Sequence, residues 1–207
     1  MGKYFVYSLN NNITMKKLSY VLMIALGAYA MQGCNSAPKD AKDSADSVNK
    51  AKDTSSMSAD TLKATTGDAK FATSAAAGGM AEIELSKLAQ QKTSDAQIKN
   101  FAAMMVKDHS AAGDSLQAIA QKENITLPAT LDADHQKKLD DLSKLTGTNF
   151  DKEYVNTMVD DHKGALSLMQ DEAKNGKDPA LAAFAKKTAT VVQMHLDAIN
   201  KIHDSMK

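Results

Sequence analysis

Three of the five histidines lie in the middle of predicted helices, each within an otherwise apolar stripe: His109, His162 and His195. Two of them end similar phrases, Met105-Val106-Lys107-Asp108-His109 and Met158-Val159-Asp160-Asp161-His162. A further predicted helix carries Glu82 at a comparable depth. Because imidazole nitrogens and carboxylate oxygens are common ligands of transition metals, the pattern predicts one potential metal ligand on each of four helices.

Two explanations of these four polar residues stay open on sequence alone. They could bind a single transition-metal ion, which would be iron, copper, manganese or zinc. Alternatively, the histidines and the glutamate form a buried hydrogen-bond network that fixes the helix register, because an unpaired buried polar group costs about 1 to 3 kcal/mol. The sequence does not decide whether Glu82 or Glu84 faces the core.

The acidic residues next to two of the histidines have a different predicted role. Asp108 and Asp161 point about 100° around the helix from His109 and His162, so they cannot share the same direction. We expect them either to orient a ring on a neighbouring helix from outside the ligand set or to pair with nearby lysines. The two remaining histidines, His135 and His203, are predicted at the surface.

Methionines surround the same zone, at positions 80, 104, 105, 158, 169 and 194. Methionine at helical spacing is usually core filler, and thioether ligation of copper(I) is the alternative. The sequence contains no Cys-x-x-Cys-His motif, which excludes covalent haem attachment of that type.

Start and stop signals place these residues on four long helices. Asp68 is expected to cap a helix that runs to about Lys92, and Ser94 with Gln97 a second helix that runs to about Asn124. Thr148 with Asp151 opens a third helix that Gly176 ends, and Asp178-Pro179 opens a fourth. Residues 131–145 form a short amphipathic helix between the second and third. Apolar stripes at spacings of three and four predict an all-α, four-helix bundle with a helical crossover.

Centres of helices coincide in a bundle whichever way each helix runs. Each predicted helix has about 24 to 28 residues and rises about 1.5 Å per residue, and the four polar residues fall near its centre. Glu82 and the three histidines should therefore meet in the core.

The amino-terminal segment resembles a bacterial lipoprotein signal. Lys16-Lys17 precedes an apolar run from Tyr20 to Met31 that is too short to cross a bilayer comfortably. The run ends in Met31-Gln32-Gly33-Cys34, which resembles a lipobox, and Cys34 is the only cysteine. Met1 or Met15 could be the true start. We expect Cys34 to be acylated and to anchor the protein durably through several acyl chains.

Composition sets the remaining boundaries. Residues 34–68 are rich in Ala, Lys, Asp, Ser and Thr, and such a segment buries too little apolar surface to offset its ordering entropy. The expected organisation is an upstream extension and signal peptide over 1–33, a lipid-anchored flexible linker over 34–68 and a folded domain over 69–207. The formal net charge is +0, which argues against a nucleic-acid partner, and protein partners are not indicated.

Several phrases together resemble a known family. They are 79–85 (Gly-Met-Ala-Glu-Ile-Glu-Leu), Phe101-Ala102 with 105–109, Phe150-Asp151 with Tyr154 and 158–162, and Phe184-Ala185 with His195. From Phe71 to Ile202 the chain resembles domain-of-unknown-function family 4142, a group of bacterial secreted and outer-membrane proteins. The resemblance implies a ferritin-like bundle and no established activity.

A two-iron enzyme is not expected. Ferritin-like di-iron sites use Glu-x-x-His on two helices, whereas valine stands three residues before each core histidine, at Val106, Val159 and Val192. The sequence therefore predicts a cell-envelope lipoprotein, more readily a non-catalytic protein than an enzyme, that binds at most one metal ion. Asn35 after Cys34 favours the outer membrane, with the domain facing the periplasm or the cell surface.

Overall fold

The computed structural model describes residues 40–54 and 63–206, and these form an all-α structure. Six helices and no strand occur in these two ranges: α1 (Ala41–Thr54), α2 (Thr66–Lys92), α3 (Ala96–Lys122), α4 (Ala133–Ser143), α5 (Gly147–Asn175) and α6 (Pro179–Ser205). The fold class is therefore confirmed as all-α, whereas its ferritin-like character stays a prediction. None of the helices within the described ranges has the length and hydropathy needed to cross a membrane.

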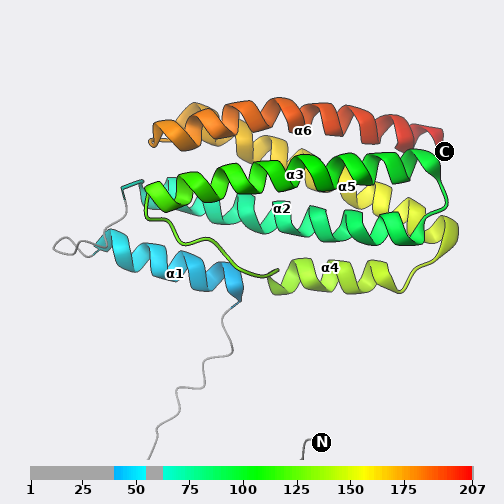
Figure 1. Cartoon of the computed structure of the whole chain (residues 1–207), viewed down its shortest axis with the longest axis horizontal. Coiled ribbons are helices and arrows are strands. Elements are labelled where there is room, and N and C mark those ends of the chain that lie inside the picture. Colours follow the sequence, from blue (N-terminus) through cyan, green and yellow to red (C-terminus); the bar gives the residue numbers. More distant parts are fainter. Residues whose placement is uncertain (1–39, 55–62, 207) are drawn as a thin grey trace, which may run out of the picture. The chain divides into compact units, whose positions relative to one another are not determined.

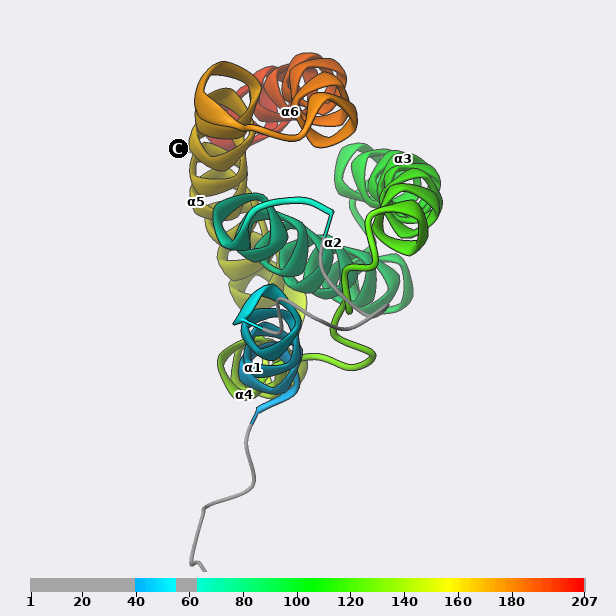
Figure 2. The ribbon, with the colours of Figure 1, turned by 90° about the vertical axis from the view of Figure 1, so that its left-hand side faces the viewer.

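The four long helices pack side by side in the cyclic order α2, α3, α6, α5, so that each contacts two neighbours (Figures 1 and 2). Helix α4 lies outside this set against α2 and α5, and carries the chain from α3 back to the start of α5 (Figure 1). The crossover predicted over 131–145 is thus present as α4.

Two apolar clusters fill the space between the long helices. One contains Leu85, Met105 and Met158, and the other contains Phe71, Leu116 and Leu181. Along α2, α3, α5 and α6, the predicted polar residues all fall between the stretches that supply these two clusters. The apolar packing above and below therefore fixes the level at which the polar residues meet.

Side-chain caps define where the long helices begin, and two differ from the predicted ones. Thr65, not Asp68, is the N-cap of α2, and Asp68 completes a capping box from the third helical position. Helix α3 is capped by Asp95, whose carboxylate accepts from the backbone of Gln97 and Ile98. Asp178 and Pro179 open α6 as predicted.

Helix α5 begins without the predicted cap. It starts at Gly147, and its N-cap residue Thr146 makes no side-chain capping hydrogen bond, so Thr148 and Asp151 lie inside the helix. Gly147 has a φ of +56°, a left-handed conformation that glycine adopts at little cost. The tight entry from α4 into α5 therefore depends on this glycine and not on a polar cap.

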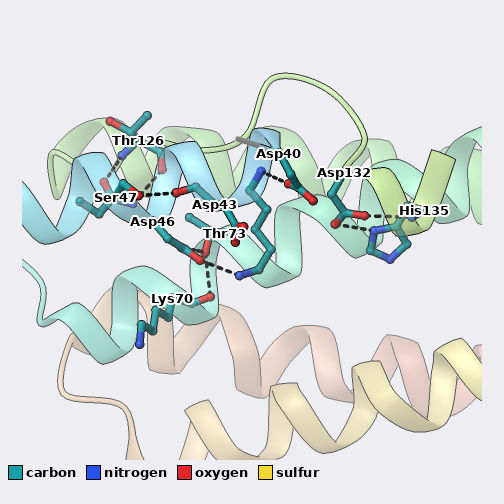
Figure 3. Close-up of polar contacts among 11 residues, drawn as sticks. Asp40, Asp43, Asp46, Ser47, Lys70, Thr73, Thr126, Asp132 and His135 are labelled. Atoms are coloured by element: carbon teal, nitrogen blue, oxygen red, sulfur yellow. Dashed lines mark hydrogen bonds and ion pairs between the residues drawn. The ribbon is translucent and has the colours of Figure 1, made fainter. Parts of the chain in front are cut away.

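Helix α1 corrects the prediction of an unstructured linker over 34–68. Residues 41–54 are helical and pack against α2. The side chain of Asn49, 1% exposed, donates to the backbone oxygen of Thr126 at 2.9 Å and accepts from its backbone nitrogen at 2.8 Å. Asp46 accepts a hydrogen bond from the Thr73 hydroxyl of α2 at 2.5 Å (Figure 3). Composition was misleading because polar contacts to distant residues hold this helix.

The remaining parts of the predicted domain organisation fall on residues that are not described. The signal peptide over 1–33 and Cys34 lie outside the described ranges. The described helices cover the predicted domain over 69–207 as far as residue 206, and a further helix, α1, precedes it.

Candidate metal centre

Four polar side chains from four helices meet in the core, as the helix-centre argument predicts. Glu82 comes from α2, His109 from α3, His162 from α5 and His195 from α6. The centroids of the three imidazole rings lie 5.4 to 5.9 Å apart. His162 and His195 are fully buried, the side chain of His109 is 10% exposed, and Glu82 is 4% exposed.

One nitrogen of each ring faces a polar partner. Nδ1 of His162 donates to the backbone oxygen of Met158 at 2.8 Å, because a carbonyl oxygen only accepts. Nε2 of His195 donates to the carboxylate of Asp108 at 3.0 Å. Nδ1 of His109 lies 3.1 Å from Oε2 of Glu82. With its proton on the nitrogen that faces the partner, a neutral ring carries its lone pair on the other nitrogen.

Those other nitrogens are Nε2 of His109, Nε2 of His162 and Nδ1 of His195, and none of them has a hydrogen-bond partner within the described ranges. One potential ligand atom from each of the three rings lies within 4.8 Å of the other two. An ion 2.0 to 2.1 Å from each nitrogen would require the rings to close by at most roughly 0.7 Å. The three histidines could therefore hold a single metal ion after a small inward adjustment.

Glu82 contacts the rings of His109 and His162, and its role as a fourth ligand stays a prediction. Its Oε2 faces Nδ1 of His109, and its Oε1 lies 3.4 Å from Nδ1 of His162, the nitrogen that already donates to Met158. A carboxylate on the protonated nitrogen of a ligand histidine orients the ring and raises its basicity. The structure brings His109, His162 and His195 together as residues that could hold a metal ion, and Glu82 lies outside that group.

The neighbouring acidic residues separate into two roles. Asp108 of α3 orients the ring of His195 across the helix interface, which is one of its two predicted roles. Asp161 does not contact a ring but forms an ion pair with Lys138 of α4 at 2.6 Å. Glu84 also lies outside the site, since it is half-exposed and pairs with Lys87 at 2.8 Å.

The other histidines and the methionines do not join the centre. His135 lies at the start of α4, where Nδ1 is 2.7 Å from the Asp132 carboxylate (Figure 3), and His203 lies 3.7 Å from Asp204. Met105 and Met158 pack in the apolar core, as expected of core filler, whereas Met194 is 52% exposed.

Burial keeps two of the histidines, His109 and His162, uncharged. It lowers the pKa of His109 to about 3, and repulsion from His162 and His195 contributes to the shift. Burial also lowers the pKa of His162 to about 4. For Glu82, burial together with the negative charge of Asp161 raises the pKa to about 8. Rings that are already neutral at pH 7 can bind a cation without first releasing a proton.

Aromatic residues close one side of the centre. The ring of Phe101 lies 6.1 Å from that of His162 and 6.4 Å from that of His195, centroid to centroid. Beyond it, the hydroxyl groups of Tyr154 and Ser86 are 3.0 Å apart and satisfy each other. Tyr154 is therefore not a partner of the histidines.

Two features of the site are absent from the sequence-based prediction. The first is the hydrogen bond to the Met158 carbonyl. Every histidine inside a helix has a backbone carbonyl four residues before it, so the sequence gives no sign of this contact. The second feature is a cavity next to His109 and Glu82, whose lining includes four helical glycines: Gly78, Gly79, Gly113 and Gly164. A glycine inside a helix costs about 1 kcal/mol relative to alanine. The four glycines were therefore the one sign of this cavity that the sequence offers.

Comparison with known proteins supports the fold. A crystal structure described as a DUF305 fragment from Deinococcus radiodurans matches with a TM-score of 0.62 and 11% sequence identity, over 69% of this chain and 98% of that chain. At this identity the likeness concerns the fold alone. No curated protein matches the chain. A family model described as "Domain of unknown function (DUF4142)" matches residues 53–202.

Proposed function

Since the chain belongs to the DUF4142 family, whose description assigns no function, we propose from the site itself that it binds one transition-metal ion through His109, His162 and His195. The observation that carries this proposal is a buried site in which one nitrogen of each ring lies within 4.8 Å of the others, while each ring has a nitrogen without a hydrogen-bond partner. Leaving a buried polar atom unsatisfied costs about 1 to 3 kcal/mol, whereas a cation would satisfy all three atoms together.

The outer contacts support the same proposal. Asp108 and the Met158 carbonyl each accept a hydrogen bond from the ring nitrogen opposite the one without a partner, and Glu82 lies 3.1 Å from Nδ1 of His109. Hydrogen bonds of this kind hold the tautomer and the orientation of metal-bound imidazoles. A purely structural network of histidines would instead join the rings to one another through their free nitrogens.

The donor set favours a single borderline metal ion. Three imidazoles suit zinc, copper or iron. A second ion would need bridging carboxylates, and valine occupies the places where a di-iron site has them, at Val106, Val159 and Val192. The ferritin-like bundle that we propose for the four long helices therefore holds one ion. Three protein ligands also leave a coordination position open, as in metal sites that bind a further ligand.

Metal content tests this proposal directly. We expect the full chain, purified without a histidine tag and offered Zn²⁺, Cu²⁺, Fe²⁺ and Mn²⁺ separately, to retain about one equivalent of at least one ion after desalting. The triple variant H109A/H162A/H195A should retain none. His135→Ala, which removes a histidine outside the centre, is the matched control and should bind as the wild type does.

Equal retention by wild type and triple variant, or no retention by either, would contradict metal binding. The histidines would then be a structural network, and the protein a non-catalytic structural or interaction protein.

We also propose that this metal-binding domain belongs to a lipoprotein of the cell envelope, anchored at Cys34 in the outer membrane. Support comes from the charged, then apolar, then Gly33-Cys34 order of the amino-terminal sequence. An alkyne fatty acid fed to expressing bacteria should label the wild type and not Cys34→Ala. Asn35→Ala, one residue further on, is the control and should be labelled. Labelling that persists in Cys34→Ala would contradict a lipid anchor at this residue.

A further inference from the structure

A cavity of about 620 Å³ adjoins the metal centre, and its volume lies within the range of about 300 to 1,000 Å³ that is usual for small-molecule sites. Residues of α2, α3, α5 and α6 line it, and Glu82 and His109 of the centre belong to its wall. We call this space the glycine-walled chamber, because Gly78 and Gly79 of α2, Gly113 of α3 and Gly164 of α5 also line it. Phe101 covers the rings of His162 and His195, and the chamber provides a way to the third ring.

The glycines are not explained by helix packing. A Cβ atom added at Gly78, Gly113 or Gly164 would meet nothing within 4 Å, so close contact between helices does not require glycine there. At Gly79 the added atom would lie 3.9 Å from Nδ1 of His109, an ordinary contact. A left-handed backbone does not require glycine either, because Gly147 has the one positive φ among the described glycines. The four positions instead keep the volume beside the centre free of side chains.

The charges in the wall restrict what the chamber can hold. The wall is mainly apolar, and besides Glu82, His109 and His135 it includes the carboxyl groups of Asp114, Asp160 and Asp161 but no Lys or Arg from the described ranges. An anion would be attracted by a metal ion on the histidines, but it would meet the three acidic groups in the wall and no Lys or Arg. A second cation would be repelled by a metal ion on the histidines. An uncharged molecule has neither penalty and gains from contact with the apolar wall.

We propose that the glycine-walled chamber binds an uncharged, mainly apolar small molecule whose lone-pair donor atom occupies the open coordination position of the metal. The placement of the donor atom rests on the proposed metal-binding function, whereas binding of the apolar part needs only the chamber. The chamber thus selects the ligand by charge and size, and the metal selects it by its donor atom.

The test uses 4-phenylimidazole at pH 8, where it is neutral, with azide as the anionic comparison. Co²⁺ replaces the native metal in the full chain, since its visible absorption changes when a ligand enters its coordination shell. We expect 4-phenylimidazole to change the spectrum and azide to require at least a tenfold higher concentration. Azide that binds as tightly as 4-phenylimidazole would overturn the proposed charge selection.

Substitutions in the chamber wall distinguish ligand binding in the chamber from metal binding by the histidines. Gly78→Leu and Gly113→Leu fill the chamber and should weaken 4-phenylimidazole at least tenfold while the protein still binds Co²⁺, with Gly78→Ala intermediate. Ala103→Leu adds the same side chain at an exposed position of α3 away from the chamber and is the control. Unchanged affinity in folded Gly78→Leu and Gly113→Leu would contradict the proposal.

Benzene distinguishes failure of this inference from failure of the metal site. In metal-free protein, benzene should shift NMR signals of residues lining the chamber in the wild type and not in Gly78→Leu. Benzene binding without any Co²⁺ binding would remove the metal function and the donor-atom part of the proposal, and leave the apolar chamber supported. Co²⁺ binding with no response to either 4-phenylimidazole or benzene would overturn the inference and leave metal binding intact.

Discussion

Zinc at 1,000 times its dissociation constant should raise the free energy of unfolding of the full chain by about 4.1 kcal/mol, because the ion binds the assembled site and not the separated histidines of the unfolded chain. Asp108→Asn should reduce this stabilisation by about 1.4 to 2.7 kcal/mol. Its carboxylate holds the ring of His195 at 3.0 Å, and loss of such an outer partner weakens metal binding about 10- to 100-fold. Denaturant unfolding at fixed free Zn²⁺ measures both values.

Asp161→Asn is the matched control for this experiment. Asp161 precedes His162 in sequence as Asp108 precedes His109, but its carboxylate pairs with Lys138 and contacts no ring. Zinc should therefore stabilise Asp161→Asn as much as the wild type. The assignment of outer partners fails if the two variants lose equal amounts, or if only Asp161→Asn loses stabilisation.

Acid should destabilise the metal-free protein through His162. The pKa of this buried ring is lowered from 6.5 to about 4, so between these values the unfolded chain binds a proton that the folded chain does not. Stability therefore falls as pH falls, by about 1.4 kcal/mol per pH unit and by roughly 3 kcal/mol over the window. Stability is unaffected by this group above about pH 6.5.

Glu82 changes the free energy of unfolding with pH in the opposite direction, so it must be replaced before the contribution of His162 can be measured. Its pKa is raised from 4.5 to about 8, so the folded chain retains a proton in this interval and stability rises as pH falls. The comparison is therefore between E82Q and E82Q/H162L, unfolded by urea in the presence of a chelator. Between pH 6.5 and 4, the free energy of unfolding of E82Q should fall by roughly 3 kcal/mol more than that of E82Q/H162L. Parallel pH profiles would show that His162 is not buried, and E82Q/H135L is the control for loss of a histidine elsewhere.

Helical periodicity was sufficient to predict the four long helices and the meeting of Glu82 with the three histidines. Apolar residues at spacings of three and four fix which face of each helix is buried, and helix centres coincide in a packed set. The strong signal of Asp178 and Pro179 gave the start of α6 correctly, whereas the caps of α2, α3 and α5 were displaced by one to three residues. Several Thr, Ser and Asp residues near each start could serve as caps, and the sequence does not rank them.

The roles of the individual groups in the site depend on geometry that the sequence does not contain. Glu82 was expected as a ligand, and its carboxylate lies 3.1 Å from Nδ1 of His109 and 3.4 Å from Nδ1 of His162. Asp108 and Asp161 stand in the same relation to their histidines in sequence. Only the helix packed opposite each of them decides that one holds a ring and the other a lysine.

The docking of α1 changes how this domain can be excised. A fragment that starts at residue 69 lacks Thr65, the cap of α2, and lacks Asn49, which pairs with both backbone groups of Thr126. The family match begins at residue 53, within the last turn of α1, so a fragment cut at that boundary loses Asn49 as well. The shortest fragment that keeps all the contacts described above begins at Asp40, whose carboxylate accepts from the first residue of α4.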